Sequence, residues 1–383
     1  MKAVVTHMKR GARVLLPALA VSLVLATGAA WACAICFSGR VVAFGQKIDA
    51  SDAVVLATPA GETGFYRVVT TIKGATLAGA LITDTLPPDP TLVAPNWPML
   101  LLRNKLSHQW SVLGSIEEGQ AGWLRALAAG GPTSSRPAVG AWPRTLDTTG
   151  DLSDDDWVAR LALVAANLES ADRLAAAIAY GEIARAPYRQ LRSLRGTREP
   201  GEITAWLDDP HLASRQPAYT LLLGIVGGPA DAQGIEARIE KLRAVHRADN
   251  LAALIAADLE IRGPSRLDYV VEAFLTDKSR SLPEIEGALL ALSVQGAADA
   301  EIPRSRIVSA YRDFIRAHPA MAGFVVQDLS DWNEFDAADE LKMAMKSGAI
   351  RDPASQYAVL TFLKRDPGGL AVARQSMGSD LAP

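Results

Sequence analysis

The hydrophobic pattern of this chain changes its period once, and that change divides the sequence into two kinds of structure. Before residue 127, apolar residues occur in short runs, some of them alternating with polar residues, as β-strands require. After residue 151 they recur every three or four residues, which is typical of amphipathic helices. The 23 residues between them, 128–150, include 13 Gly, Pro, Ser or Thr and indicate a linker. We therefore expect an α+β multidomain protein with domains at 33–127 and 151–383.

Five short strands are predicted in the first domain. They fall at 53–58, 65–72, 80–85, 99–102 and 110–116, and a short helix is predicted at 123–127. Residues 99–102 are apolar on both faces, and Gly114 is a predicted bulge. Five short strands in so few residues favour a small closed β-barrel, because closure leaves no exposed edge.

A family resemblance is carried by two cysteines near the predicted mature N-terminus and by the runs at 50–56 and 65–74. Over roughly a quarter of the chain, these features resemble the netrin-like domain, the OB-type barrel of the tissue inhibitors of metalloproteinases. In that family the amine and carbonyl of the N-terminal cysteine chelate the zinc of a target protease. The resemblance implies that role for Cys33, and hence an inhibitor of envelope metalloproteases as an alternative function.

Residues 1–32 are predicted to be a signal peptide. Four basic residues precede the apolar stretch 14–30, and Ala30-Trp31-Ala32 fits the small-x-small pattern of signal peptidase sites. The alternative is a membrane anchor, because residues 14–32 contain no charge. Cleavage would change the formal net charge from −3 to −3 − 4 = −7. We expect a soluble product in the periplasm or outside the cell.

Cys33 and Cys36 are the only two cysteines of the chain, and four roles are open to them. They could form a short-loop disulfide in an oxidising compartment, or Cys33 could carry a lipid that brings the protein to a membrane. They could also form a catalytic redox pair, or supply half of a metal site. The last two roles make a thiol-redox or metal-binding protein another alternative function.

A weak internal repeat lies in the helical part. Shifting residues 207–233 by 68 positions gives 9 identities, among them Leu207 with Leu275 and Asp209 with Asp277. A period of 68 holds two units of 34, which suits stacked helical hairpins. The sequence Leu-Asp-Asp-Pro at 207–210, followed by a helix and Gly-Gly at 227–228, resembles divergent HEAT-like repeats. We therefore expect an all-helical α-α superhelix.

Motifs of catalysis are missing from the sequence, which contains no HExxH, GxSxG or GxxxxGK[ST]. The formal net charge of −3 lacks the basic excess that is typical of nucleic-acid-binding proteins. No cofactor is expected. Arg189, Arg192 and Arg195 are predicted to share one face of a helix. That face could bind an acidic partner or lipid headgroups, or it could be a solvated face paired with acids of the chain. We predict a non-catalytic interaction protein whose partner is another envelope or extracellular protein.

Overall fold

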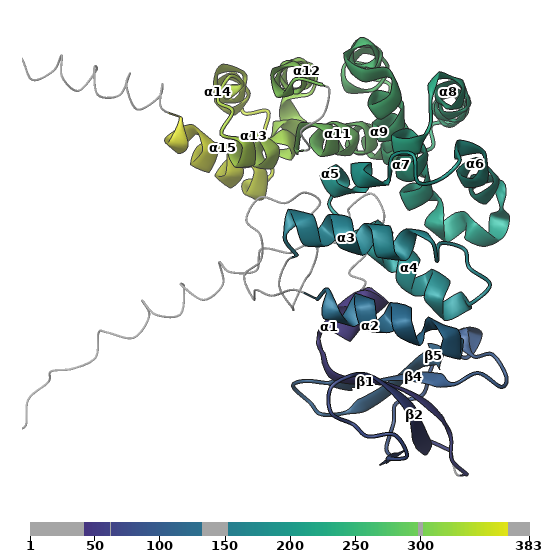
Figure 1. Ribbon diagram of the computed structural model, residues 1–383. Coiled ribbons are helices and arrows are strands. Elements are labelled where there is room, and N and C mark those ends of the chain that lie inside the picture. The colour runs from purple at the N-terminus through teal and green to yellow at the C-terminus, as the bar shows by residue number, and fades with distance from the viewer. Residues whose placement is uncertain (1–41, 62, 132–151, 298–301, 367–383) are drawn as a thin grey trace, which may run out of the picture. The chain divides into compact units, whose positions relative to one another are not determined.

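The computed structural model describes residues 42–61, 63–131, 152–297 and 302–366 (Figure 1). One short helix is followed by a curled antiparallel sheet and then by further helices, so the predicted α+β class is confirmed. The predicted signal peptide, Cys33, Cys36 and residues 132–150 of the predicted linker lie outside the described residues.

The sheet has five strands in the order β3-β2-β1-β4-β5. They are β1 (Ser51–Pro59), β2 (Tyr66–Lys73), β3 (Leu81–Ile82), β4 (Met99–Asn104) and β5 (Trp110–Ser115). All five predicted strands are present, although the third is only two residues long. The edge strands β3 and β5 are not paired with each other, so the described sheet is a half-barrel and not the closed barrel that the sequence predicted. One reason is that Leu86 occupies the free edge of β5, where its N–H donates to Trp110 O at 3.0 Å.

Both faces of the central strands are buried, as the apolar runs predicted. Val54 and Leu56 of β1 face the main core, which is shared with the helices. Val55 and Ala57 face a smaller core inside the curl of the sheet. The register between β4 and β5 shifts beside Gly114, as predicted, and there a Cβ atom would lie 2.6 Å from the backbone oxygen of Leu92. Glycine at this position therefore allows the loop that carries Leu92, which precedes β4, to pack closely against β5.

Helices make up the rest of the described chain. Beside the sheet are α1 (Phe44–Asp49) and α2 (Ala121–Ala129), followed after the gap by α3 (Asp154–Ala165), α4 (Arg173–Arg185), α5 (Tyr188–Leu191), α6 (Pro200–Asp208), α7 (Gln216–Val226), α8 (Pro229–Ala244), α9 (Leu251–Arg262), α10 (Leu267–Val270), α11 (Leu282–Ala297), α12 (Arg304–Ala317), α13 (Val326–Trp332), α14 (Ala338–Lys346) and α15 (Pro353–Arg365). Short 3-10 turns join several of them, namely η3 (Arg192–Leu194), η4 (Pro210–Arg215) and η7 (Pro319–Val325), while η6 (Val271–Leu275) is a π-helical turn. Within the described residues, every helix is too short or too polar to cross a membrane.

Polar residues that the sequence analysis singled out form the cap of one helix and the turns between others. Ser153 accepts a hydrogen bond from Asp156 N at 3.2 Å and so caps α3, as the acidic run after it predicted. Asp209 and Asp277, which the 68-residue shift aligns, each accept a bond from the backbone N–H two residues later, at 2.8 and 2.9 Å. The aligned segments therefore begin with the same kind of turn. The HEAT type of the repeat stays a prediction.

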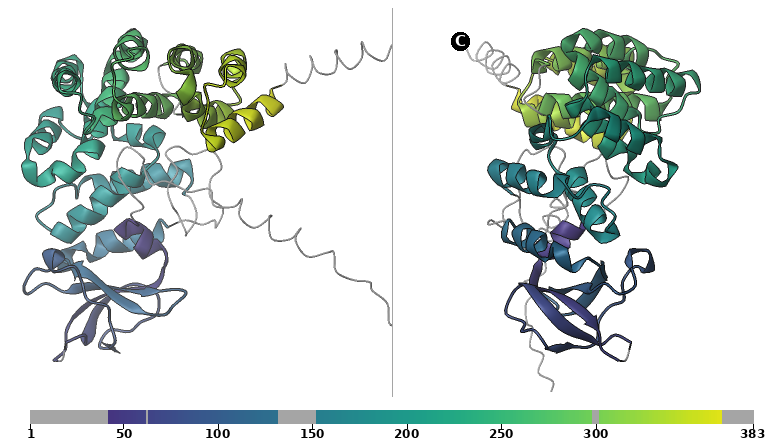
Figure 2. Two further views of the ribbon diagram at one scale, coloured as in Figure 1. Left: turned by 180° about the vertical axis from the view of Figure 1, so that it is seen from behind. Right: turned by 45° about the vertical axis from the view of Figure 1, so that its right-hand side comes forward.

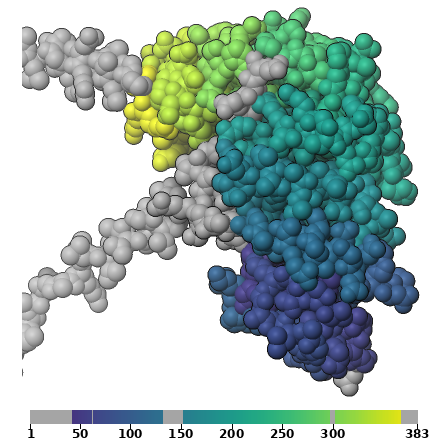
Figure 3. Space-filling model, viewed as in Figure 1, coloured from purple at the N-terminus to yellow at the C-terminus, as the bar shows by residue number. Residues whose placement is uncertain are grey.

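The sheet and the helices meet at a buried ionic cluster, formed by Asp49 of α1, Arg160 of α3, and Glu182 and Arg185 of α4. All four side chains are at most 2% exposed. Arg160 contacts Glu182 at 2.5 Å and Asp49 at 3.0 Å, and Arg185 contacts Glu182 at 2.8 Å. Helices α1 and α2 lie between the sheet and α3 and α4 (Figure 2). The molecular surface accordingly runs without a break from the sheet onto these helices (Figure 3).

Gly45 of α1 makes room for this cluster, because a Cβ there would lie 1.7 Å from Glu182 Oε1. Burial raises the pKa of Asp49 to about 6, against the attraction of Arg160 and Arg185. Burial acts the same way on Glu182, but the two arginines outweigh it and hold the pKa of Glu182 below its ordinary value.

Candidate functional site

The three arginines singled out in the sequence lie on α5, on η3 and just after it. Tyr188, Leu191 and Leu194, the opposite face, are at most 2% exposed, so the predicted division into two faces is present. The arginines are partly exposed, with 46% for Arg189, 17% for Arg192 and 59% for Arg195.

Acidic side chains of the chain itself contact all three arginines. Arg192 donates to both oxygens of Glu260 on α9, at 2.8 and 2.7 Å, and Arg195 contacts the same carboxylate at 3.2 Å. Arg189 forms an ion pair with Asp154 at the start of α3. Arg185 belongs instead to the buried ionic cluster. The arginine face thus helps to hold α5 and η3 against α3 and α9.

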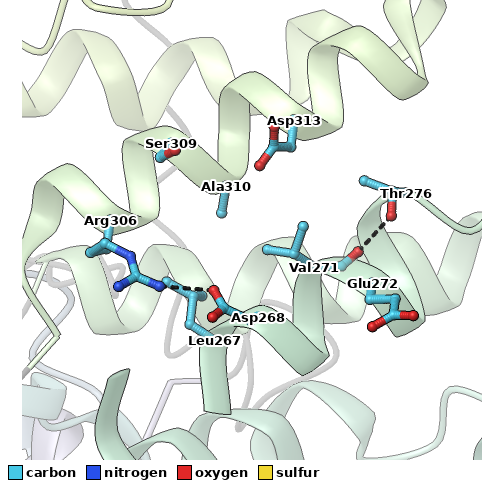
Figure 4. A pocket seen from close by; sticks show the side chains of 9 residues that line it. All are labelled: Leu267, Asp268, Val271, Glu272, Thr276, Arg306, Ser309, Ala310 and Asp313. Atoms are coloured by element: carbon cyan, nitrogen blue, oxygen red, sulfur yellow. Dashed lines mark hydrogen bonds and ion pairs between the residues drawn. The ribbon is translucent and has the colours of Figure 1, made fainter. Parts of the chain in front are cut away.

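A pocket of about 240 Å³ lies on the helical part, between α10 with η6 on one side and α12 on the other. It is lined by Leu267, Asp268, Val271, Glu272, Thr276, Arg306, Ser309, Ala310 and Asp313. Figure 4 shows the carboxylates of Asp268, Glu272 and Asp313 around the apolar side chains of Val271 and Ala310. Sequence reasoning missed this pocket, because its lining combines residues up to 46 positions apart (267 to 313).

The π-helical turn shapes one wall of the pocket. Thr276 N donates to Val271 O at 2.9 Å, a bond that spans five residues, and the Thr276 hydroxyl donates to the same oxygen at 3.1 Å. One extra residue is thereby placed in the turn that carries Val271 and Glu272. Such π turns occur frequently at functional sites. No hydrophobic period in the sequence indicates where one will form.

Charges around the pocket are mostly negative. Asp268 forms an exposed ion pair with Arg306 at 2.8 Å, and Asp313 forms one with Arg316 outside the lining. Glu272 is exposed and has no ion-pair partner among the described residues. The lining therefore holds three carboxylates and one guanidinium group. Exposed ion pairs contribute at most about 1 kcal/mol, so a ligand cation can replace Arg306 beside Asp268 at low cost.

A second pocket, of about 580 Å³, is lined by residues of η7 and of the turn before α15, among them His318, Arg351 and Asp352. In its lining, the positive charge of Arg351 is offset by the negative charge of Asp352. Burial, and then the charge of Lys278, hold the pKa of His318 below its ordinary value, so that imidazole is neutral at neutral pH. Across the described ranges, no three His, Cys, Asp or Glu side chains are grouped so that they could hold a metal ion.

Comparison of this chain with known protein families, with curated proteins and with solved structures finds no match. The geometry of the molecule is therefore the basis on which its function is inferred.

Proposed function

We propose that this protein is a non-catalytic interaction protein of the bacterial envelope or the extracellular space, and that its helices bind a partner protein. The observation that carries the proposal is the acidic pocket between η6 and α12. Successive packed helices offer a long surface on which a partner chain can lie. A pocket on such a surface provides a fixed point for one side chain of that partner.

The size and charge of the pocket support a peptide segment as its occupant. Sites for small molecules usually enclose about 300 to 1,000 Å³. At about 240 Å³ the pocket suits a single long side chain better than a whole cofactor. Its lining joins an apolar floor, Val271 and Ala310, to three carboxylates. A lysine or arginine side chain matches both, because its stem is apolar and its end is a cation.

The test places a photo-crosslinking residue, p-benzoylphenylalanine, at Ser309 and follows adducts in cells that produce the protein. We expect an adduct with a partner protein, attached through a basic segment. Glu272→Lys should weaken binding of a lysine-rich peptide at least tenfold, because it places a like charge beside the ligand cation. Glu118→Lys makes the same charge change at an exposed acid near the sheet and should leave binding unchanged. Equal effects of the two substitutions, or no adduct at residue 309, would contradict the proposal.

A further inference from the structure

Arg306 occupies one end of the acidic pocket from within the chain. It lies in the first turn of α12, and its guanidinium group points toward Asp268 on the opposite wall (Figure 4). Nη2 of Arg306 donates to Oδ1 of Asp268 at 2.8 Å. A positively charged side chain of the protein itself therefore lies where the pocket offers this carboxylate to a ligand.

The ion pair between these two residues is weak. Both side chains are exposed, Arg306 by 47% and Asp268 by 81%. Within the described ranges, the guanidinium group of Arg306 forms a hydrogen bond with Asp268 alone, through one of its five N–H groups. Strong arginine–carboxylate pairs are shielded from water or use two parallel hydrogen bonds, and this pair has neither feature. A ligand cation can therefore compete with Arg306 for the same carboxylate.

Helix stability does not explain why a cation stands at residue 306. The partial positive charge at the start of a helix disfavours cations, and the first turn of α12 contains no acid that would offset Arg306. Asp268, in contrast, lies in the first turn of α10, where the helix itself favours a negative charge. Neither helix needs the ion pair in order to form.

The other end of the pocket carries negative charge that Arg306 does not neutralise. Glu272 is exposed and has no ion-pair partner in the described part of the chain, and Asp313 pairs with Arg316 outside the lining. Asp268 and Glu272 are four residues apart, so they lie on one side of the segment formed by α10 and η6. A cation that enters beside Glu272 can thus reach Asp268 once Arg306 has moved away.

We propose that Arg306 is an internal competitor that regulates binding at this pocket. The inference rests on the proposed function, in which the pocket receives a lysine or arginine side chain of a partner protein. In the free protein, Arg306 takes the place of that cation at Asp268. The side chain of the partner displaces it, and the guanidinium group of Arg306 turns to solvent. Every basic segment must break this ion pair before it binds, so segments that offer only a weak contact are rejected.

The test measures binding of a fluorescein-labelled peptide of five lysines to the full chain by fluorescence anisotropy, at about 0.15 M salt. Arg306→Gln should lower the dissociation constant about three- to fivefold, because an exposed ion pair shifts an equilibrium by no more than about fivefold. If Arg306 only supported the pocket wall, the same substitution would weaken binding instead. The matched control is Arg238→Gln, because Arg238 of α8 forms a similarly exposed ion pair with Asp208 of α6, at 2.5 Å, outside the pocket lining. This control should leave the dissociation constant unchanged.

A double-mutant cycle separates displacement of Arg306 from simple charge repulsion. In the Asp268→Asn background, Arg306→Gln should change the dissociation constant by less than about 1.5-fold, because no carboxylate is freed and the remaining repulsion is screened. The proposal would be overturned by an equal gain in both backgrounds, by no gain in the wild-type background, or by an equal gain from Arg238→Gln. The proposed function survives each of these outcomes if Glu272→Lys still weakens binding. If neither the wild type nor the Arg306→Gln protein binds the peptide, both ideas fail.

Discussion

Asp328 on α13 is a half-buried acid that accepts hydrogen bonds from the hydroxyl groups of Ser293 and Tyr311. The Tyr311 hydroxyl donates to its carboxylate at 2.7 Å. Burial raises the pKa of Asp328 from 3.8 to about 6, even though hydrogen bonds from Ser293 and Tyr311 favour the charged form. The folded protein therefore binds a proton more tightly at this site than the unfolded chain does. The stability that follows is fully present below about pH 3.8 and is lost as the pH rises through about 6.

Asp328→Asn should remove this pH dependence, because the amide stays neutral and its oxygen can still accept from Tyr311. At about pH 7.5 we expect the variant to have a free energy of unfolding about 1 to 3 kcal/mol above that of the wild type. At about pH 4 the difference should fall below about 1 kcal/mol, since the wild-type carboxyl is then protonated when folded. Urea unfolding at both pH values measures this. Equal free energies of unfolding for Asp328→Asn and the wild type at about pH 7.5 would show that the charged carboxylate of Asp328 does not destabilise the fold.

Sequence patterns located the arginines of α5 and η3 but could not identify the residues that contact them. The spacing of Arg189, Arg192 and Arg195 predicted one shared face, and the structure has that face. It did not predict Glu260 as the acid that contacts Arg192, because the two are 68 residues apart. Ser153, whose bonding partner is three residues away, could be assigned as a cap from the sequence alone. At the scale of the residue, prediction succeeds where the chemistry is local.

Close contact between helices α7 and α9 depends on one small residue. A Cβ on Gly224 would lie 2.6 Å from the Cα of Ala257, so the two backbones touch where glycine faces alanine. Gly234 of the neighbouring α8 is exposed, and a Cβ there would meet nothing within 4 Å. The same substitution at the two positions therefore separates packing from helix propensity.

Gly224→Ala and Gly234→Ala should change stability in opposite directions. Gly224→Ala forces α7 away from α9 and should cost about 1 to 3 kcal/mol of unfolding free energy. Gly234→Ala should add about 0.5 to 1 kcal/mol, because alanine favours the helix more than glycine does. Chemical denaturation of the two variants and the wild type measures both changes. A Gly224→Ala protein as stable as the wild type would show that α7 and α9 can move apart without a loss of stability.

Helices and strands could be predicted where the hydrophobic pattern kept one period over the whole length of the element. Strands β1, β2, β4 and β5 and helix α3 follow directly from the hydrophobic pattern. The predicted strand at 80–85 failed over most of its length, because pairing with β2 reaches only Leu81 and Ile82. The π turn η6 was not predictable, since it depends on which carbonyl Thr276 contacts. Element edges and irregular turns are decided by tertiary contacts, not by local preference.

On the scale of the molecule, the Asp49–Arg160–Glu182–Arg185 cluster joins the sheet to the helices. Arg160 also donates to Gly130 O at 3.2 Å, after the last turn of α2, so it binds α1, α2 and α4 together. The composition of residues 128–150 predicted two domains that a linker separates, and it gave no sign of this contact. Arg160 and Asp49 are 111 residues apart in the sequence, and neither belongs to a recognisable motif.

Removing a single member of this cluster should cost more than removing an opposite pair. Arg160→Met leaves the carboxylates of Asp49 and Glu182 with Arg185 alone, and we expect a loss of about 3 to 5 kcal/mol. Glu182→Leu leaves two buried guanidinium groups with one carboxylate and should cost a similar amount. The double variant retains the balanced pair Asp49–Arg185 and should be more stable than either single variant. A double-mutant cycle by urea unfolding measures the coupling free energy, which we expect to exceed about 2 kcal/mol. Additive losses would show that the cluster does not act as one unit and that apolar packing alone holds the sheet against the helices.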